Sequence, residues 1–225
     1  MKLIVFGANG ILGQWVWRSA IKAGHDTVAY VRSPDKLDQT DPGFSKLTVV
    51  TGDVMDADAM RHACADREVC INCTSPAGGN STIELAQSIV TNAKTAGIET
   101  FYMVGGLGAL WVPGSNRSTL VQDWDDVDAR TQYGLPAELP LDKLQMMTKG
   151  HLASMAFMEE AGVHFTFMCP GAMIDAPATP NRVVTLDELG GSNTLRVNAG
   201  DVADVMVGDI GKGALLGHRV SVAAS

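Results

Sequence analysis

The chain has 225 residues, of which 46% are hydrophobic and 19% are charged, so it can bury a sizeable core and is not intrinsically disordered. Its formal net charge is −8 and it contains no run of lysine or arginine, which argues against nucleic acids and anionic membranes as its main partners. Any anionic ligand must therefore be bound by a local group of residues and not by a broadly basic surface.

Four cysteines are too few for a disulfide scaffold in a chain of this length, and we expect a cytoplasmic location. Cys70 and Cys73 form a C-x-x-C pair inside an expected buried strand, where residues three apart point to opposite faces. A core role is favoured over a redox or metal site, and no metal is expected. No apolar stretch approaches the ~18 residues of a membrane helix, and the apolar run at the N-terminus is too short for a signal peptide.

Short apolar runs alternate with amphipathic segments along the chain. In chain order the pattern predicts a strand at 3–6, a helix at 11–23, strands at 27–31 and 47–50, a helix at 56–65, a strand at 69–73, a helix at 81–96, a strand at 100–104, a helix at 143–161 and a strand at 164–168. Strands of this kind, separated by helices, predict an α/β fold with a doubly wound parallel sheet covered on both faces. We expect one domain over residues 1–225.

Two stretches depart from this alternation. Residues 105–142 are polar and contain several prolines and glycines, and residues 171–198 begin the tail that follows the sixth expected strand. A connection that is long and without clear structure is usually functional, and both stretches would lie at the carboxyl edge of the sheet, where such folds bind ligands. We expect two irregular substrate-side insertions, followed by a mixed segment that ends in the apolar run 219–223.

A glycine-rich turn directly follows the first expected strand and opens the first helix. It reads G-x-x-G-x-x-G and comprises Gly7, Ala8, Asn9, Gly10, Ile11, Leu12 and Gly13. Glycines permit the tight turn, the approach of backbone to a pyrophosphate and the close packing of helix on strand. The N-terminus of the helix then offers unpaired N–H groups to the phosphates, so an acidic protein can bind a dinucleotide without a basic patch.

The turn, in this context, resembles that of an atypical or extended short-chain dehydrogenase/reductase. More closely, the chain is similar over nearly its whole length to the NmrA-like subgroup that includes NAD(P)H-flavin reductases and proteins like biliverdin reductase B. The resemblance also rests on the segments at 30–37, 52–54, 104–108 and 169–171. It implies a Rossmann fold and a nicotinamide cofactor.

The resemblance also implies where the cofactor would lie. It places Asp53 and Val54 beside the adenine, and Thr74, Ser75 and Pro76 along the middle of the cofactor. It further implies cofactor contacts from Gly105, Pro170 and Gly171.

The end of the second expected strand bears on the choice of dinucleotide. A carboxylate there would bind the ribose 2′-OH of NAD, whereas this chain has Arg32 and Ser33, with Lys36 nearby. Arginine can bind a 2′-phosphate through two charge-assisted hydrogen bonds. We therefore predict NADP(H) as the cofactor, the alternative being that Arg32 is a solvated surface residue.

The catalytic residues are harder to assign. The wider family uses a Tyr-x-x-x-Lys pair, in which the lysine binds the nicotinamide ribose and lowers the pKa of the tyrosine. By resemblance Lys149 stands at the lysine position, but Gln145 replaces the tyrosine, and no serine or threonine occurs in 104–110. The alternative for Lys149 is an exposed helix lysine.

Two other residues are candidate proton donors. His151 follows Lys149 by two positions, about 200° around the helix, and a helix-surface histidine is the alternative interpretation. Tyr133, in the long connection, would reach the site if that segment folds over it, and simple packing is its alternative.

Together these features predict an NADP(H)-dependent oxidoreductase that transfers hydride to a small conjugated acceptor: a flavin, a quinone, an enone or an imine. Delocalised acceptors need less help from a protein acid than simple ketones do. The alternatives are a non-catalytic NADP(H)-binding redox sensor of the NmrA type, and an isomerase or cyclase on the same fold. We expect a small-molecule substrate and a monomer or homodimer.

Overall fold

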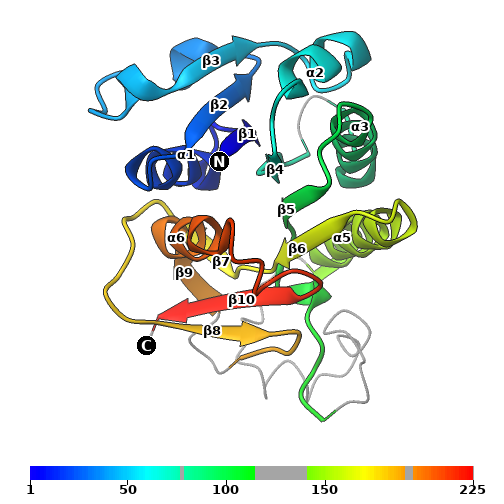
Figure 1. The fold of residues 1–225 in the computed structure, drawn as a ribbon. Coiled ribbons are helices and arrows are strands. Elements are labelled where there is room, and N and C mark those ends of the chain that lie inside the picture. The colour runs from blue at the N-terminus through cyan, green and yellow to red at the C-terminus, as the bar shows by residue number, and fades with distance from the viewer. Residues whose placement is uncertain (77–78, 115–140, 191–194, 225) are drawn as a thin grey trace.

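The computed structural model describes residues 1–76, 79–114, 141–190 and 195–224, with the side chains of 141–144 and 224 outside the description. Its main element is an eight-stranded sheet in the order β3-β2-β1-β4-β5-β6-β10-β8 (Figure 1). The strands are β1 Lys2–Phe6, β2 Asp26–Val31, β3 Thr48–Thr51, β4 Val69–Asn72, β5 Thr100–Val104, β6 His164–Met168, β8 Arg182–Leu186 and β10 Arg219–Ala224. All neighbouring pairs are parallel except β10 and β8.

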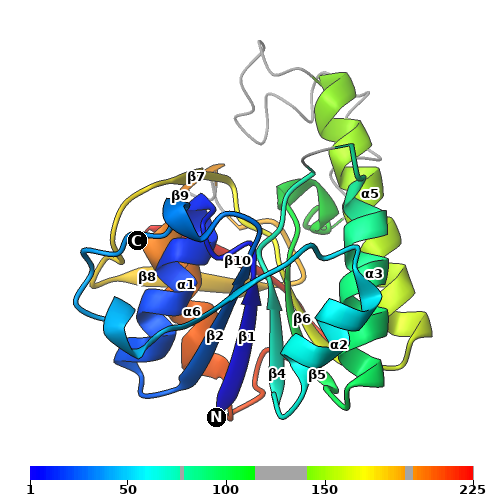
Figure 2. The same ribbon diagram turned by 90° about the horizontal axis from the view of Figure 1, so that it is seen from above.

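Helices cover both faces of this sheet (Figure 2). The helices α1 Ile11–Lys22 and α6 Ala199–Asp209 pack on one face. The helices α2 Ala57–Cys64, α3 Thr82–Thr95 and α5 Leu141–Glu160 pack on the other. Because the central strands carry apolar side chains on both faces, each face has its own hydrophobic core, as a doubly wound sheet requires. The predicted fold class is confirmed.

Local sequence explains where two of the helices begin. Ser81 and Glu84 form a capping box at the start of α3, in which each side chain binds the other residue's backbone N–H. The Asp56 carboxylate accepts hydrogen bonds from the backbone N–H groups of Asp58 and Ala59 at the start of α2. The bounds of the ten strands and helices predicted over 3–168 agree with the observed bounds within two residues.

The prediction of an irregular segment at 171–198 is wrong in part. A small parallel sheet pairs β7 Ala172–Ile174 with β9 Arg196–Asn198, and β8 extends the main sheet as its antiparallel edge. Helix α6 was also not predicted. It has no side-chain cap and contains two glycines, so its sequence favours a helix weakly, and packing against α1 supports it instead.

Three single-turn 3₁₀ helices complete the described elements: η1 Pro34–Lys36, η2 Phe44–Lys46 and η3 Leu107–Ala109. The first two lie between β2 and β3, and η3 follows β5, so η1 and η3 extend from carboxyl ends of the sheet. Among the described residues no helix is long and apolar enough to cross a membrane.

Candidate cofactor-binding and active site

The turn between β1 and α1 requires glycine at two positions for steric reasons. Gly7 has φ +72°, and a Cβ there would lie 2.7 Å from the carbonyl oxygen of Cys73. A Cβ at Gly13 would lie 2.1 Å from the carbonyl oxygen of Gly7 and 2.8 Å from the Cα of Ala8. Both contacts are to backbone, which cannot rotate away, so side chains at these positions would separate α1 from the sheet.

The N-terminus of α1 is arranged to receive an anion. Gly10 is the N-cap residue, and it makes no side-chain capping bond because it has no side chain. The first turn of α1 contains no acidic residue that would compete for its N–H groups. The partial positive charge of the helix end is therefore available to a phosphate.

A groove of about 350 Å³ lies beside this turn, at the carboxyl ends of β1, β2 and β4 and on the residues that follow β3. Its size is within the range of small-molecule sites. We call it the β1–β4 groove. It is lined by Gly7, Asn9, Gly10, Tyr30, Val31, Arg32, Ser33, Lys36, Gly52, Asp53, Val54, Cys73, Thr74, Ser75, Asn80 and Leu85.

The groove brings together many of the predicted cofactor residues, from segments far apart in the chain. These are Gly7, Asn9, Gly10, Arg32, Ser33, Asp53, Val54, Thr74 and Ser75. Tyr30, Val31, Gly52, Cys73, Asn80 and Leu85 also line it and were not among the predicted site residues. Their position at strand ends was the signal that could have found Tyr30, Val31 and Cys73.

One wall of the groove rests on Tyr30, whose hydroxyl donates a 3.0 Å hydrogen bond to the carbonyl oxygen of Asp53. A Cβ at Gly52 would lie 2.1 Å from that hydroxyl, so the backbone at Gly52 can approach only as glycine. Burial, with the nearby Asp56 and Asp53 carboxylates, raises the pKa of Tyr30. The phenol therefore remains a protonated donor that holds the Gly52–Asp53 turn in place.

The opposite wall follows β4, where Asn72 fixes the chain as it leaves the sheet. The Oδ1 atom of Asn72 accepts hydrogen bonds from the backbone N–H of Thr74 at 2.9 Å and from its hydroxyl at 2.7 Å. Asn72 is buried, so this bonding satisfies a polar group inside the protein. Thr74 and Ser75 thus have a defined backbone facing the groove.

The end of the groove beside β2 carries positive charge. Arg32 and Lys36 line it with exposed side chains, and Ser33 lies between them in sequence. Asp53 is the acidic side chain among the described lining residues, and its Oδ1 accepts a 2.9 Å hydrogen bond from the N–H of Met55. This combination of a guanidinium, an ammonium and a hydroxyl is suited to a phosphate.

The remaining predicted cofactor residues lie outside the groove lining. Leu12 and Gly13 pack inside, while Ile11 is exposed at the start of α1. A Cβ at Gly105 would lie 2.1 Å from the ring of Phe167, which gives this glycine a packing reason. Pro76, Pro170 and Gly171 follow β4 and β6 at the same edge of the sheet. Their contact with a cofactor stays a prediction.

The buried face of helix α5 contains His151 and not Lys149. Thr148, His151, Met155 and Met158 are buried, and they recur at the spacing of one helix face. Lys149 is exposed and lies outside the groove lining. Successive helical residues are about 100° apart, so Lys149 is on the side away from His151. Its role at the nicotinamide ribose stays a prediction, and Tyr133 lies outside the described residues.

The interpretation of His151 as a helix-surface residue is wrong. Its side chain is 8% exposed, and its ring meets that of Phe167 edge-on with centroids 6.4 Å apart. Burial lowers the pKa of His151 from 6.5 to about 4. Its Nδ1 has no hydrogen-bond partner within the described part of the chain, and the ring lies against Gly106. His151 is therefore a neutral imidazole at neutral pH, beside the carboxyl ends of β5 and β6.

This burial predicts a pH-dependent stability. Between pH 6.5 and 4 the unfolded chain binds a proton at His151 that the folded chain does not, so stability falls as the pH decreases. The pKa difference corresponds to a loss of about 3 kcal/mol over this interval. Urea unfolding at a series of pH values should show a smaller loss for His151→Leu than for the unaltered chain. The control variant His62→Gln, at an exposed histidine, should lose as much free energy of unfolding over this pH interval as the unaltered chain. If His151→Leu also lost as much as the unaltered chain, His151 would not be the buried neutral group.

Metal and thiol chemistry find no support among the described residues. No group of three or more histidine, cysteine or acidic side chains is placed to hold a metal ion there. Burial raises the pKa of Cys64, Cys73 and Cys169 to about 12 each, which disfavours reactive thiolates. The four cysteines are free thiols. Cys70 is buried in the core as predicted, whereas Cys73 is only partly buried and lines the β1–β4 groove.

The parallel sheet, the glycine turn and the groove at the carboxyl ends of its strands define a dinucleotide-binding Rossmann protein. The chain belongs to the NAD(P)H-binding family, which matches residues 7–210. The sequence-based resemblance to atypical short-chain dehydrogenases/reductases is thereby confirmed.

Three relatives illustrate the similarity. The barley dihydroflavonol 4-reductase is 22% identical in an alignment 212 positions long that covers 84% of this chain but only 59% of that enzyme. A candidate NADH-flavin reductase from Streptococcus pneumoniae has a similar structure, with a TM-score of 0.76, 19% identity and 100% of both chains covered. ChuY, an anaerobilin reductase from Escherichia coli O157:H7, has a TM-score of 0.70 at 20% identity, with 98% of this chain and 96% of ChuY covered. At these identities the structural likeness establishes the fold.

Proposed function

We propose that the protein is an NADPH-dependent reductase that transfers hydride to a small conjugated acceptor: a flavin, a quinone, an enone or an imine. The observation that carries the proposal is the β1–β4 groove, which joins the glycine turn to the cationic end formed by Arg32 and Lys36. The flavin and anaerobilin named for two structural relatives are conjugated molecules, which supports this class of acceptor.

The residues present fit a phosphorylated dinucleotide. The turn from Gly7 to Gly13 would hold the pyrophosphate, because its backbone is open where Cβ atoms would clash. Arg32, Ser33 and Lys36 would hold a 2′-phosphate. Asp53 and Val54 would lie beside the adenine, and Thr74 and Ser75 beside the middle of the cofactor. When bound, the reduced nicotinamide supplies hydride to the acceptor.

The choice of a conjugated acceptor follows from the side chains of α5. Gln145 occupies the position of the family's tyrosine, and an amide cannot serve as a general acid near neutral pH. His151 is buried and neutral, so it can donate a hydrogen bond but carries no readily released proton at pH 7. We propose that Lys149 contacts the nicotinamide ribose and that, of the two expected proton sources, solvent rather than His151 supplies the proton.

The first experiment is a fluorescence titration with NADPH, NADH and NADP⁺, followed by addition of FMN, a quinone and a simple enone. Tight NADPH binding with oxidation by one acceptor supports a reductase and identifies its class. Binding without oxidation by any acceptor favours a redox sensor or a non-redox isomerase. Failure to bind NADPH contradicts the proposal as a whole.

Replacing Arg32 by glutamine should weaken NADPH binding roughly tenfold and leave NADH binding unchanged, because only NADPH carries the 2′-phosphate. The measurement is the ratio of the two dissociation constants. Lys46→Gln is the matched control, since Lys46 is exposed in η2, follows the same strand and lies outside the groove lining. If Arg32→Gln weakened the binding of NADPH and NADH equally, Arg32 would not bind the 2′-phosphate.

We also propose that residues 1–225 form one domain, in which 105–142 and 171–198 form the substrate side. The free thiols support a cytoplasmic location, because an oxidising compartment favours disulfides. We propose a monomer or homodimer that acts on a small molecule.

A further inference from the structure

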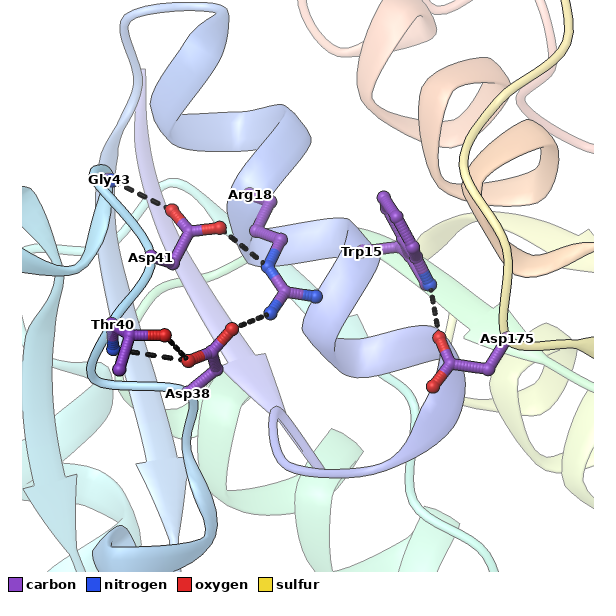
Figure 3. A network of polar contacts seen from close by, with 7 residues as sticks. All are labelled: Trp15, Arg18, Asp38, Thr40, Asp41, Gly43 and Asp175. Carbon is purple, nitrogen blue, oxygen red and sulfur yellow. Dashed lines mark hydrogen bonds and ion pairs between the residues drawn. The ribbon is translucent and has the colours of Figure 1, made fainter.

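Arg18, on α1, binds two carboxylates of the segment that follows η1 (Figure 3). Its Nη2 atom lies 2.8 Å from Oδ2 of Asp38, and its Nε atom lies 2.8 Å from Oδ2 of Asp41. The guanidinium carbon also lies 5.3 Å from the ring centroid of Trp15 and 5.1 Å from that of Trp17. One planar cation therefore holds two anions at once and is itself held by two aromatic rings.

Each carboxylate uses its second oxygen to shape the same segment. Oδ1 of Asp38 accepts hydrogen bonds from the N–H and hydroxyl of Thr40, and Oδ1 of Asp41 accepts one from the N–H of Gly43 at 2.7 Å. These bonds with Thr40 are the main reason that the pKa of Asp38 is lowered, with Arg18 contributing. Arg18 thus faces two carboxylates, each of which also holds the backbone of its own segment.

The segment is continuous with the cationic end of the β1–β4 groove. Asp38 is two residues after Lys36, and between them Leu37 is buried in the core that includes residues of α1. The N–H of Lys36 bonds to the carbonyl oxygen of Ser33, which closes the turn that carries both groove residues. The contact of Arg18 with Asp38 thus fixes the chain directly behind Lys36.

The charges of this region balance only when Arg18 is counted. Residues 32–41 contain two cations, Arg32 and Lys36, and three anions, Asp35, Asp38 and Asp41, which gives 2 − 3 = −1. Arg18 adds one positive charge and brings the sum to zero. Without Arg18, two unpaired carboxylates would follow, in the same segment of the chain, the cations that are expected to bind a phosphate.

We propose that Arg18 is a positioning residue that determines the specificity of this protein for a 2′-phosphorylated dinucleotide. It does so by neutralising Asp38 and Asp41 and holding them against α1, so that Arg32 and Lys36 can attract the phosphate. This inference rests on the proposed function, because it concerns the same cofactor site.

The test compares the dissociation constants of NADPH and NADH for a set of variants. Arg18→Met keeps an unbranched apolar stem beside the tryptophans but removes the guanidinium and its charge, and should weaken NADPH binding roughly tenfold while NADH binding changes little. Adding Asp38→Asn and Asp41→Asn to Arg18→Met should restore NADPH binding to within about twofold of the unaltered chain. Lys22→Met, an equal charge change at an exposed position of α1, should have no effect.

Asp38→Asn alone keeps the Arg18 side chain and offers a test that misfolding cannot imitate. Asparagine retains the Oδ1 acceptor for Thr40, and the region gains one net positive charge. NADPH binding should become tighter by roughly threefold or more, with NADH binding unchanged.

Two results would overturn the proposal while leaving the proposed function in place. In one, Arg18→Met weakens both dinucleotides equally, or neither, so that Arg18 is only a structural residue. In the other, the triple variant remains as poor as Arg18→Met, so that charge is not the cause. If the unaltered chain fails to bind NADPH, the proposed function fails first and this inference fails with it.

Discussion

Replacing Gly13 by alanine should raise the dissociation constant of NADPH at least roughly a hundredfold. The new Cβ would lie 2.1 Å from the carbonyl oxygen of Gly7 and 2.8 Å from the Cα of Ala8. Neither atom belongs to a flexible side chain, so α1 must move away from the turn. That movement displaces the helix N–H groups and Gly10, on which binding of the pyrophosphate depends in the proposed function.

Gly208 provides the matched control, because it is also a glycine within a helix. It lies in α6, and a Cβ there would meet nothing within 4 Å. Gly208→Ala should therefore bind NADPH normally and increase the free energy of unfolding by about 0.5–1 kcal/mol, the usual difference between alanine and glycine in a helix. Fluorescence titration and thermal unfolding measure the two effects. Normal NADPH binding by Gly13→Ala would show that the turn does not approach the phosphates.

The glycine turn could be recognised from sequence because its requirements are local. Strand 3–6, the G-x-x-G-x-x-G spacing and the helix that follows are contiguous, and the backbone that restricts Gly10 and Gly13 belongs to Gly7 and Ala8. Only the close approach of Cys73 to Gly7 depends on a distant segment. The same holds for the six core strands and four helices, whose apolar periodicity is a local property. Such features can be predicted from sequence without knowing how distant segments pack.

The orientation of α5 could not be predicted in this way. Sequence alone gives the angle between Lys149 and His151, about 200°, but not which of them faces the sheet. The structure shows that His151 faces the sheet, and the reason lies in distant residues: Gly106 leaves room for the imidazole, and Phe167 contacts its ring. The edge strand β8 and helix α6 were not predicted for the same reason. The strand β8 is stabilised by pairing with β10, and α6 is stabilised by packing against α1.

Asp209 illustrates a buried group whose role becomes visible only in the structure. Its Oδ2 accepts a 2.9 Å hydrogen bond from the Tyr102 hydroxyl, and its Oδ1 accepts one of 2.8 Å from the N–H of Ala214. The N–H of Leu215 lies 3.3 Å from both oxygens. One side chain thus joins the central strand β5, the end of α6 and the turn that leads to β10. Burial and this carboxylate raise the pKa of Tyr102, so the phenol stays a donor.

Asp209→Ala should lower the free energy of unfolding by about 4 kcal/mol, because it leaves the Tyr102 hydroxyl and two backbone N–H groups without their acceptor. Tyr102→Phe removes one donor and leaves the backbone bonds of Asp209 in place, so it should cost only about 1–1.5 kcal/mol. Urea unfolding of both variants measures the difference. NADPH binding by the folded fraction should be unchanged in each, since neither residue lines the β1–β4 groove. Equal costs would mean that the Tyr102 bond alone matters; a loss of NADPH binding at full stability would instead connect this cluster to the cofactor site.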